Sequence, residues 1–147
     1  MIDKIHIAEE ASSKELVNQI YQGFCEHSIE KMGYDGNIQQ YAFVARNEKG
    51  DMIGAAVVKT FWGALHIKYL YLKPNYRGKG IGKSLMDQAF KKGLQLACRF
   101  AFVETMSFQA LDFYKNLGFQ EEFVRKGYDK KTSFHYLKKA LNPQKAT

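Results

Sequence analysis

A strand-like run, a glycine turn and a helical pattern follow one another over residues 65–97, and this order constrains the fold more than any other feature of the chain. Residues 65–72 (LHIKYLYL) are rich enough in apolar and aromatic side chains for a buried strand. Residues 73–82 (KPNYRGKGIG) are basic and carry Gly78, Gly80 and Gly82. Residues 83–97 place apolar side chains at helical spacing. Because the first turn of a helix has unpaired N–H groups and a partial positive charge, this arrangement predicts an anion-binding site.

Three phosphate-binding patterns compete for the glycine turn. The dinucleotide fingerprint G-x-G-x-x-G needs its third glycine one residue after Gly82. The P-loop needs one more residue than the chain has between Gly78 and the Gly82-Lys83-Ser84 sequence. The third pattern, Arg/Gln-x-x-Gly-x-Gly/Ala, is matched at every fixed position from Arg77 to Gly82. It is the acetyl-coenzyme A signature of the GNAT acyltransferases.

A second segment resembles the same family. In it, Ala110 is followed four residues later by Tyr114, and Gly118-Phe119 closes the segment. The two signatures stand in the family's order, with one strand-like segment between them. The resemblance covers residues 2–141 and is strongest over 65–119, so the chain is identified by resemblance as a GNAT-family N-acetyltransferase. This implies a mixed α/β fold, in which an antiparallel meander precedes a strand–helix–strand crossover with splayed parallel strands.

The remaining elements are predicted from periodicity and turn residues. Ser12-Ser13-Lys14-Glu15 matches a capping box, so a helix should follow it. Ser107 is expected to cap the last helix, and Gly118 to end it. Strands are expected over residues 2–8, 41–46, 52–60, 65–72, 100–105, 119–126 and 132–141, the first four forming the meander.

Length and composition suit one soluble domain. We expect residues 1–141 to form a single acetyltransferase domain and residues 142–147 a polar tail, because 147 residues can close one hydrophobic core. No apolar run approaches the roughly 20 residues that cross a bilayer, and the polar N-terminus does not resemble a signal peptide, so a cytoplasmic location is expected. Cys25 and Cys98 are too far apart for a CxxC pair and are interpreted as small apolar residues. No metal is expected.

The net charge of +7 has two interpretations. A basic domain can bind the phosphates of a nucleic acid. The alternative, which we favour, is that the positive charge partly serves an anionic cofactor and otherwise lies on solvated faces, because the lysines are spread along the chain. Oligomeric state, including a homodimer, is left open.

The resemblance implies acetyl-CoA as co-substrate, with its pantetheine arm in the opening between the splayed strands. A backbone N–H near Leu72 would face the thioester carbonyl. The implied cofactor contacts are Leu70, Tyr71, Leu72, Arg77, Gly78, Lys79, Gly80, Ile81, Gly82, Lys83, Ser107 and Tyr114. The family often has Asn at the position of Ser107, which can still donate one hydrogen bond.

Two catalytic roles follow from the resemblance and the chemistry of amine acetylation. Tyr114 matches the family's general acid, which protonates the coenzyme A sulfur, although spacing alone favours a core tyrosine. Many members carry a Glu on the strand before the glycine turn, whereas here that strand has no carboxylate. The general base is left open between Glu104, His66 and a water chain.

The amine acceptor is not identified by any motif. Few and scattered carboxylates disfavour a polycation, so a small amine-bearing metabolite is preferred and a peptide or protein amine comes second. His27, Tyr34 and Asp35 are candidate substrate contacts or plain loop residues, and Trp62 covers a ligand or packs on a strand. Two other classes of function stay open: a non-catalytic acyl-CoA sensor and a nucleic-acid binder.

Overall fold

The computed structural model describes residues 3–141, and the chain divides into two compact units, Met1–Gly36 and Asn37–Thr147. Each unit is described by itself. No helix within residues 3–141 is both long enough and apolar enough to cross a membrane.

The first unit contains one helix, α1, over Lys14–Met32. The Ser13 hydroxyl caps it by accepting a hydrogen bond from the Leu16 N–H at 3.1 Å. Gly33 ends the helix in the left-handed conformation, at φ 69°, where glycine has no steric penalty. The predicted helix is therefore present, but the cap is one residue later than the capping box placed it.

The strand predicted over residues 2–8 is wrong for residues 3–8, which are neither helix nor strand; residue 2 lies outside the described chain. Ile5 and Ile7 are 75% and 95% exposed, so their alternation with polar residues does not correspond to a buried face. No partner strand pairs with this segment among the described residues. The antiparallel meander consequently has three strands, not four.

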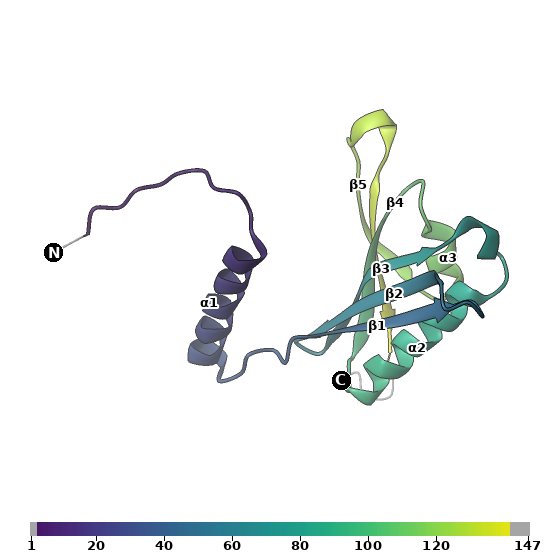
Figure 1. The fold of residues 1–147 in the computed structure, drawn as a ribbon, viewed down its shortest axis with the longest axis horizontal. Coiled ribbons are helices and arrows are strands. Elements are labelled where there is room, and N and C mark those ends of the chain that lie inside the picture. The colour runs from purple at the N-terminus through teal and green to yellow at the C-terminus, as the bar shows by residue number, and fades with distance from the viewer. Residues whose placement is uncertain (1–2, 142–147) are drawn as a thin grey trace. The chain divides into compact units, whose positions relative to one another are not determined.

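The second unit is built on a six-stranded mixed sheet with the strand order β1-β2-β3-β4-β6-β5 (Figure 1). Among the strands that the structure describes, only β3 and β4 pair in parallel; the other neighbours are antiparallel. The predicted mixed α/β fold, with a meander followed by a crossover to a parallel strand, is confirmed. The strands are β1 Gln39–Arg46, β2 Met52–Phe61, β3 Ala64–Leu72, β4 Phe100–Met106, β5 Gln120–Arg125 and β6 Phe134–Ala140.

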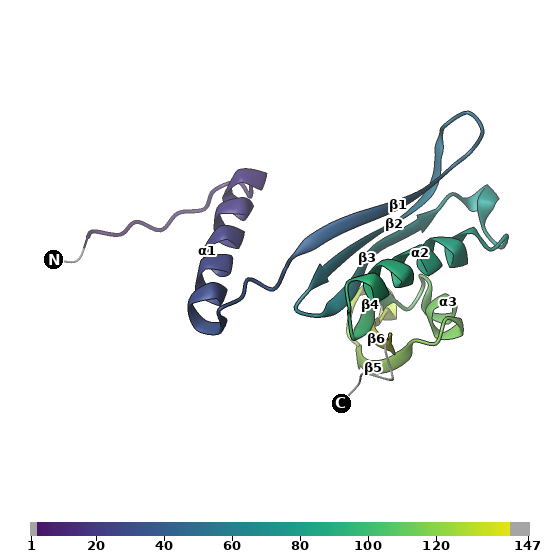
Figure 2. The ribbon, with the colours of Figure 1, turned by 90° about the horizontal axis from the view of Figure 1, so that it is seen from below.

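Helices α2 (Ile81–Gln95) and α3 (Leu111–Asn116) cover one face of this sheet (Figure 2). Their apolar sides meet the inward side chains of the central strands, which alternate with outward ones along each strand. Burying a large apolar side chain contributes about 1.5–3 kcal/mol, so this layer holds the second unit together. The core residues with the lowest exposure include Val58, Leu65, Ile67, Met86, Ala89, Ala101, Val103, Tyr114, Phe119 and Leu137.

Two short 3₁₀ helices complete the unit, η1 over Pro74–Tyr76 and η2 over Asp129–Lys131. The first leads from β3 into the glycine turn, and the second closes the β5–β6 hairpin. Between β2 and β3, Trp62 and Gly63 form a two-residue turn with φ values of 50° and 77°, as a tight hairpin requires.

Candidate active site

The parallel strands β3 and β4 separate halfway along their length. Their pairing runs only from Ala64–Phe100 to Ile67–Val103, although β3 continues to Leu72 and β4 to Met106. At the same point β3 has a bulge, because Val58 pairs with Ile67 and Val57 pairs with Tyr69. A bulge bends a strand and increases its twist, so it turns β3 away from β4. From residue 68 onward, the edge of β3 that faces the gap therefore pairs with no strand of the described chain.

This separation opens a cleft of about 940 Å³. Side chains from both faces of the sheet reach it. Ile67 and Val103 belong to the helix-covered face, whereas Glu104 alternates with Val103 and belongs to the other. The cleft thus passes through the sheet at the point where the two strands part.

The glycine turn forms one end of the cleft. Gly78 and Gly80 have φ values of 74° and 82°, which a residue with a Cβ rarely adopts. None of the backbone N–H groups from Gly78 to Lys83 has a hydrogen-bond acceptor within residues 3–141; the first bonded N–H in this stretch is that of Ser84, to the Gly80 carbonyl at 3.0 Å. Arg77 Nε donates to the Leu72 carbonyl at 2.9 Å and so ties the turn to the end of β3. The turn presents a run of free donors and cationic side chains, which suits an anionic group.

Tyr114 lies in the core beneath the cleft, on α3, and only 5% of it is exposed. Its ring packs edge-on against Phe113 and Phe119 at 5.3 and 5.5 Å between centroids. Burial raises the pKa of the Tyr114 phenol to about 12, because the phenolate would lose its hydration. No hydrogen bond holds its hydroxyl within the described chain, and the residue lines the cleft. Its proton is retained at neutral pH and is available to a group in the cleft.

Glu104 and His66 form a pair on the opposite face of the sheet. The Nε2 atom of His66 lies 2.7 Å from Oε2 of Glu104, and their side chains are 21% and 29% exposed. The imidazole also stacks on Phe102, with centroids 4.4 Å apart and planes 2° from parallel. Glu104 lines the cleft, whereas His66 is not among the lining residues. Two residues that sequence analysis considered as alternative bases are therefore in contact.

Ser107 does not cap α3, which corrects the prediction. The helix begins at Leu111 after Ala110, and the Ser107 hydroxyl instead accepts a hydrogen bond from the Ser133 N–H at 3.2 Å. The intervening loop is held by Gln109, whose side-chain carbonyl accepts from the Met106 N–H at 2.9 Å. This loop adds three residues between Ser107 and the helix start, which moves Ser107 out of capping distance.

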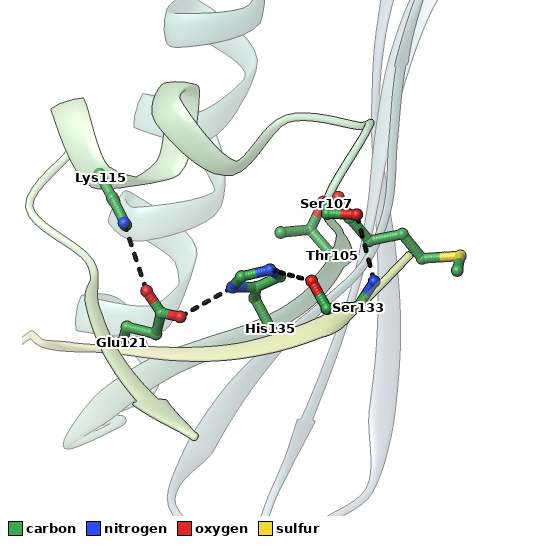
Figure 3. A network of polar contacts seen from close by, with 7 residues as sticks. Thr105, Ser107, Lys115, Glu121, Ser133 and His135 are labelled. Atoms are coloured by element: carbon green, nitrogen blue, oxygen red, sulfur yellow. Dashed lines mark hydrogen bonds and ion pairs between the residues drawn. The ribbon is translucent and has the colours of Figure 1, made fainter. Parts of the chain in front are cut away.

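A chain of polar contacts connects Ser107 with α3 and the last two strands (Figure 3). Ser133 Oγ lies 2.8 Å from His135 Nε2, and His135 Nδ1 lies 2.7 Å from Glu121 Oε1. Lys115 Nζ approaches the other oxygen of Glu121 at 3.2 Å. The hydrogen bond to His135, followed by the contact with Lys115, lowers the pKa of Glu121. No local pattern in the sequence indicates a role for His135 or Lys115, because these contacts join segments that are far apart in the chain.

Most of the sequence-predicted site residues come together in the cleft. Two of them, Lys79 and Ile81, do not line it, and neither does Trp62. His27, Tyr34 and Asp35 belong to the first unit. The aromatic Phe108 and the buried Thr105 also line the cleft; they lie between the two signatures and were not predicted from the sequence. The predicted residues that line the cleft are Leu70, Tyr71, Leu72, Arg77, Gly78, Gly80, Gly82, Lys83, Glu104, Ser107 and Tyr114.

Across residues 3–141, no three His, Cys, Asp or Glu side chains gather closely enough to hold a metal ion. The cleft instead combines free backbone donors, a buried phenol and the carboxylate of Glu104, whose partner His66 lies outside the lining.

A mixed sheet whose central parallel strands part beside a glycine turn defines the class of acyl-CoA N-acyltransferase folds. The chain belongs to the acetyltransferase (GNAT) family, whose family model matches residues 12–119. The chain is therefore a member of a family of acetyltransferases, and the resemblance inferred from the two sequence signatures is confirmed.

Known proteins of this family resemble the chain over much of its length. A Streptomyces morookaense protein named blasticidin-S acetyltransferase is 30% identical over 105 residues, which cover 71% of this chain and 77% of that protein. The crystal structure of an Agrobacterium tumefaciens protein assigned as an acetyltransferase has a TM-score of 0.83 and 21% identity, covering 93% of this chain and 99% of that one. A Bacillus anthracis protein assigned as a streptothricin acetyltransferase, solved in complex with acetyl coenzyme A, has a TM-score of 0.62 and 22% identity, covering 69% and 62%.

Proposed function

We propose that this protein is an N-acetyltransferase that moves the acetyl group of acetyl-CoA directly to a primary amine of a small molecule. The observation that carries the proposal is the combined cleft, in which free N–H groups of the turn 78–83 lie at one end and the parting of β3 and β4 at the other. The family match over residues 12–119 spans parts of both units, so we propose that residues 1–141 act as one catalytic domain.

The glycine turn would hold the diphosphate of the cofactor. Backbone N–H groups from Gly78 to Lys83 donate to the phosphate oxygens, and the side chains of Arg77 and Lys83 line the same region. In this proposal Lys79 and Ile81 contribute through their backbone alone, because their side chains do not line the cleft. The pantetheine arm would run along the unpaired edge of β3, at Leu70, Tyr71 and Leu72, with Ser107 across the gap.

The acid and the base would then act from opposite sides of the sheet. An ammonium substrate gives one proton to the carboxylate of Glu104, which leaves a lone pair on nitrogen to attack the thioester carbon. The C–N bond forms, the C–S bond breaks, and the departing sulfur takes the proton of Tyr114. The amide nitrogen loses its second excess proton to the tyrosinate, and Glu104 releases its own to water. Burial keeps Tyr114 protonated until this step, which suits an acid.

The acceptor class is inferred from two observations. The relative from Streptomyces morookaense is named for the acetylation of blasticidin-S, which favours a small-molecule acceptor here. The cleft lining carries two carboxylates, on Glu104 and Asp112, which is fewer than a site for a polycation usually has. A peptide or protein amine is the second candidate.

The test is a thiol-release assay with acetyl-CoA against a broad panel of amines. We expect amine-dependent release of free coenzyme A and an acetylated product visible by mass spectrometry. Binding of acetyl-CoA without amine-dependent release would favour a non-catalytic sensor and overturn the proposal. Steeply salt-dependent affinity for DNA or RNA in place of acetyl-CoA binding would favour a nucleic-acid binder.

A further inference from the structure

We propose that His66 is a positioning residue that fixes one oxygen of the Glu104 carboxylate and leaves the other for the amine substrate. The inference rests on the proposed function, because it concerns the step in which Glu104 takes a proton from that amine. It assigns a role to a side chain that lies outside the cleft and acts through its neighbour.

Two contacts determine where the imidazole lies. Its plane is fixed by stacking on Phe102 at 4.4 Å, and its edge by the contact of Nε2 with Glu104 Oε2 at 2.7 Å. The two strands also hold the pair in register, since His66 pairs with Phe102 in the last stretch before β3 and β4 separate. A ring held by a flat neighbour and by one hydrogen bond has little freedom to rotate away from the carboxylate.

The contact has a defined chemical direction. A carboxylate only accepts hydrogen bonds, so His66 must carry its proton on Nε2 to donate to Oε2. Oε1 of Glu104 has no hydrogen-bond partner within the described residues, and the side chain lines the cleft. The amine proton therefore goes to Oε1, where an O–H bond forms as one N–H bond of the ammonium breaks.

A second His–Glu pair in the molecule shows what a purely structural contact looks like. His135 and Glu121 also approach to 2.7 Å, but Lys115 lies 3.2 Å from the other oxygen of Glu121. Both oxygens of Glu121 are thus occupied, and neither His135 nor Glu121 lines the cleft. The His66–Glu104 pair differs in leaving one oxygen unoccupied beside the site.

The experiment compares two replacements of His66 in the full chain. His66→Phe keeps a flat ring over Phe102 and removes the donor, whereas His66→Gln keeps an N–H donor close to the position of Nε2. We expect His66→Phe to lower kcat/KM for the amine at least 10-fold and His66→Gln to stay within about 3-fold of the unsubstituted protein. The affinity for acetyl-CoA, measured by calorimetry, should be unchanged in both. Glu122→Gln, an exposed carboxylate outside the cleft, serves as the matched control and should keep full activity.

A double substitution separates positioning from structure. If His66 acts through Glu104, adding His66→Phe to Glu104→Gln should cause no further loss of kcat/KM, because the two changes affect one unit. Additive losses, or equal losses for the Phe and Gln variants, would overturn the proposal. If His66→Phe does not fold, His66→Leu replaces it in the comparison with His66→Gln. Absence of turnover in the unsubstituted protein would instead overturn the proposed function. Full activity in His66→Phe would overturn this inference and leave the proposed function intact.

Discussion

Tyr114 lies between Phe113 and Phe119 in the core, and its environment determines which proton state the phenol can hold. The folded protein raises the pKa of this phenol from 10.0 to about 12, whereas the unfolded chain ionises near the ordinary value. The same burial that makes the residue look like a core tyrosine in the sequence thus keeps a proton ready for the leaving sulfur. The buried packing of Tyr114 and its proposed role as an acid are therefore compatible.

We predict that Tyr114→Phe lowers kcat at least 10-fold and leaves the dissociation constant of acetyl-CoA within about 2-fold. The ring keeps its packing, so only the proton donor is lost. Stopped assays with saturating acetyl-CoA, beside calorimetric titration, measure the two quantities. Unchanged turnover would remove Tyr114 from the mechanism.

The raised pKa of Tyr114 also affects stability, since the phenol of the unfolded chain ionises from about pH 10 while that of the folded protein stays neutral to about pH 12. The free energy of unfolding should therefore fall as pH rises through this window, and less so in Tyr114→Phe.

Thr60 illustrates a residue whose polar group is not satisfied. It is 4% exposed in the core face of β2, and its hydroxyl has no hydrogen-bond partner in the described structure. Thr60→Val keeps the branched shape and removes the buried hydroxyl, so it should raise the free energy of unfolding by about 1 kcal/mol. Urea denaturation measures this change. A lower stability in the variant would show that the hydroxyl has a partner in solution.

At the scale of elements, the cleft exists because one strand bends and one turn has unusual backbone angles. The bulge in β3 separates it from β4, and the turn between Gly78 and Gly82 brings α2 to the mouth of the opening. The α2 helix itself lies close to the sheet at Gly93, where an added Cβ would be 3.0 Å from Leu65. Strand, turn and helix are therefore placed together by backbone geometry as well as by the apolar packing of α2 on the sheet.

Gly80→Ala tests the turn. Gly80 has φ 82° and open space around it, so an alanine there strains the backbone by roughly 1 kcal/mol without a clash. If the N–H groups of the turn hold the cofactor, we expect the dissociation constant of acetyl-CoA to rise about 5-fold or more. Gly50→Ala is the matched control, because Gly50 has φ 86°, is equally open and lies in the β1–β2 turn. It should lose similar stability and keep cofactor affinity; equal affinities for both variants would contradict the role of the turn.

For the molecule as a whole, the sequence is most informative where the pattern is local. The strand, glycine turn and helix over residues 65–97 can be predicted because each element is specified by neighbouring residues, and the two signatures then supply the fold. The strand expected over residues 2–8 is absent from residues 3–8 for the opposite reason. Two alternating isoleucines match a strand locally, but no strand among residues 3–141 pairs with them.

The His66–Glu104 contact could not be predicted from sequence. The two residues are 38 positions apart, and only the parallel register of β3 and β4 brings them together. The same holds for Ser107, whose partner Ser133 lies on a segment 26 residues later. Such contacts depend on how strands align across the sheet, which no local pattern specifies.

Glu121 links three elements of the second unit, and its pH dependence should therefore be seen in global unfolding. The hydrogen bond from His135 and the charge of Lys115 both favour the carboxylate, so its pKa in the folded protein lies below the ordinary value of 4.5. A carboxyl group whose pKa is lowered by folding stabilises the folded state at pH values above its pKa in the unfolded chain. This stabilisation is lost as the pH falls through its pKa in the folded protein.

At pH 7, Glu121→Gln should lower the melting temperature by about 2 °C, a small effect because the contacts of Glu121 with His135 and Lys115 lie at the surface. The difference should shrink steadily below pH 4.5 in thermal scans followed by circular dichroism. Glu122→Gln, on the same strand, has no ion pair within residues 3–141 and is the matched control at pH 7, where it should leave the melting temperature nearly unchanged. A Glu121→Gln deficit that persists unchanged at pH 3 would mean that shape, not charge, holds α3 to the last two strands.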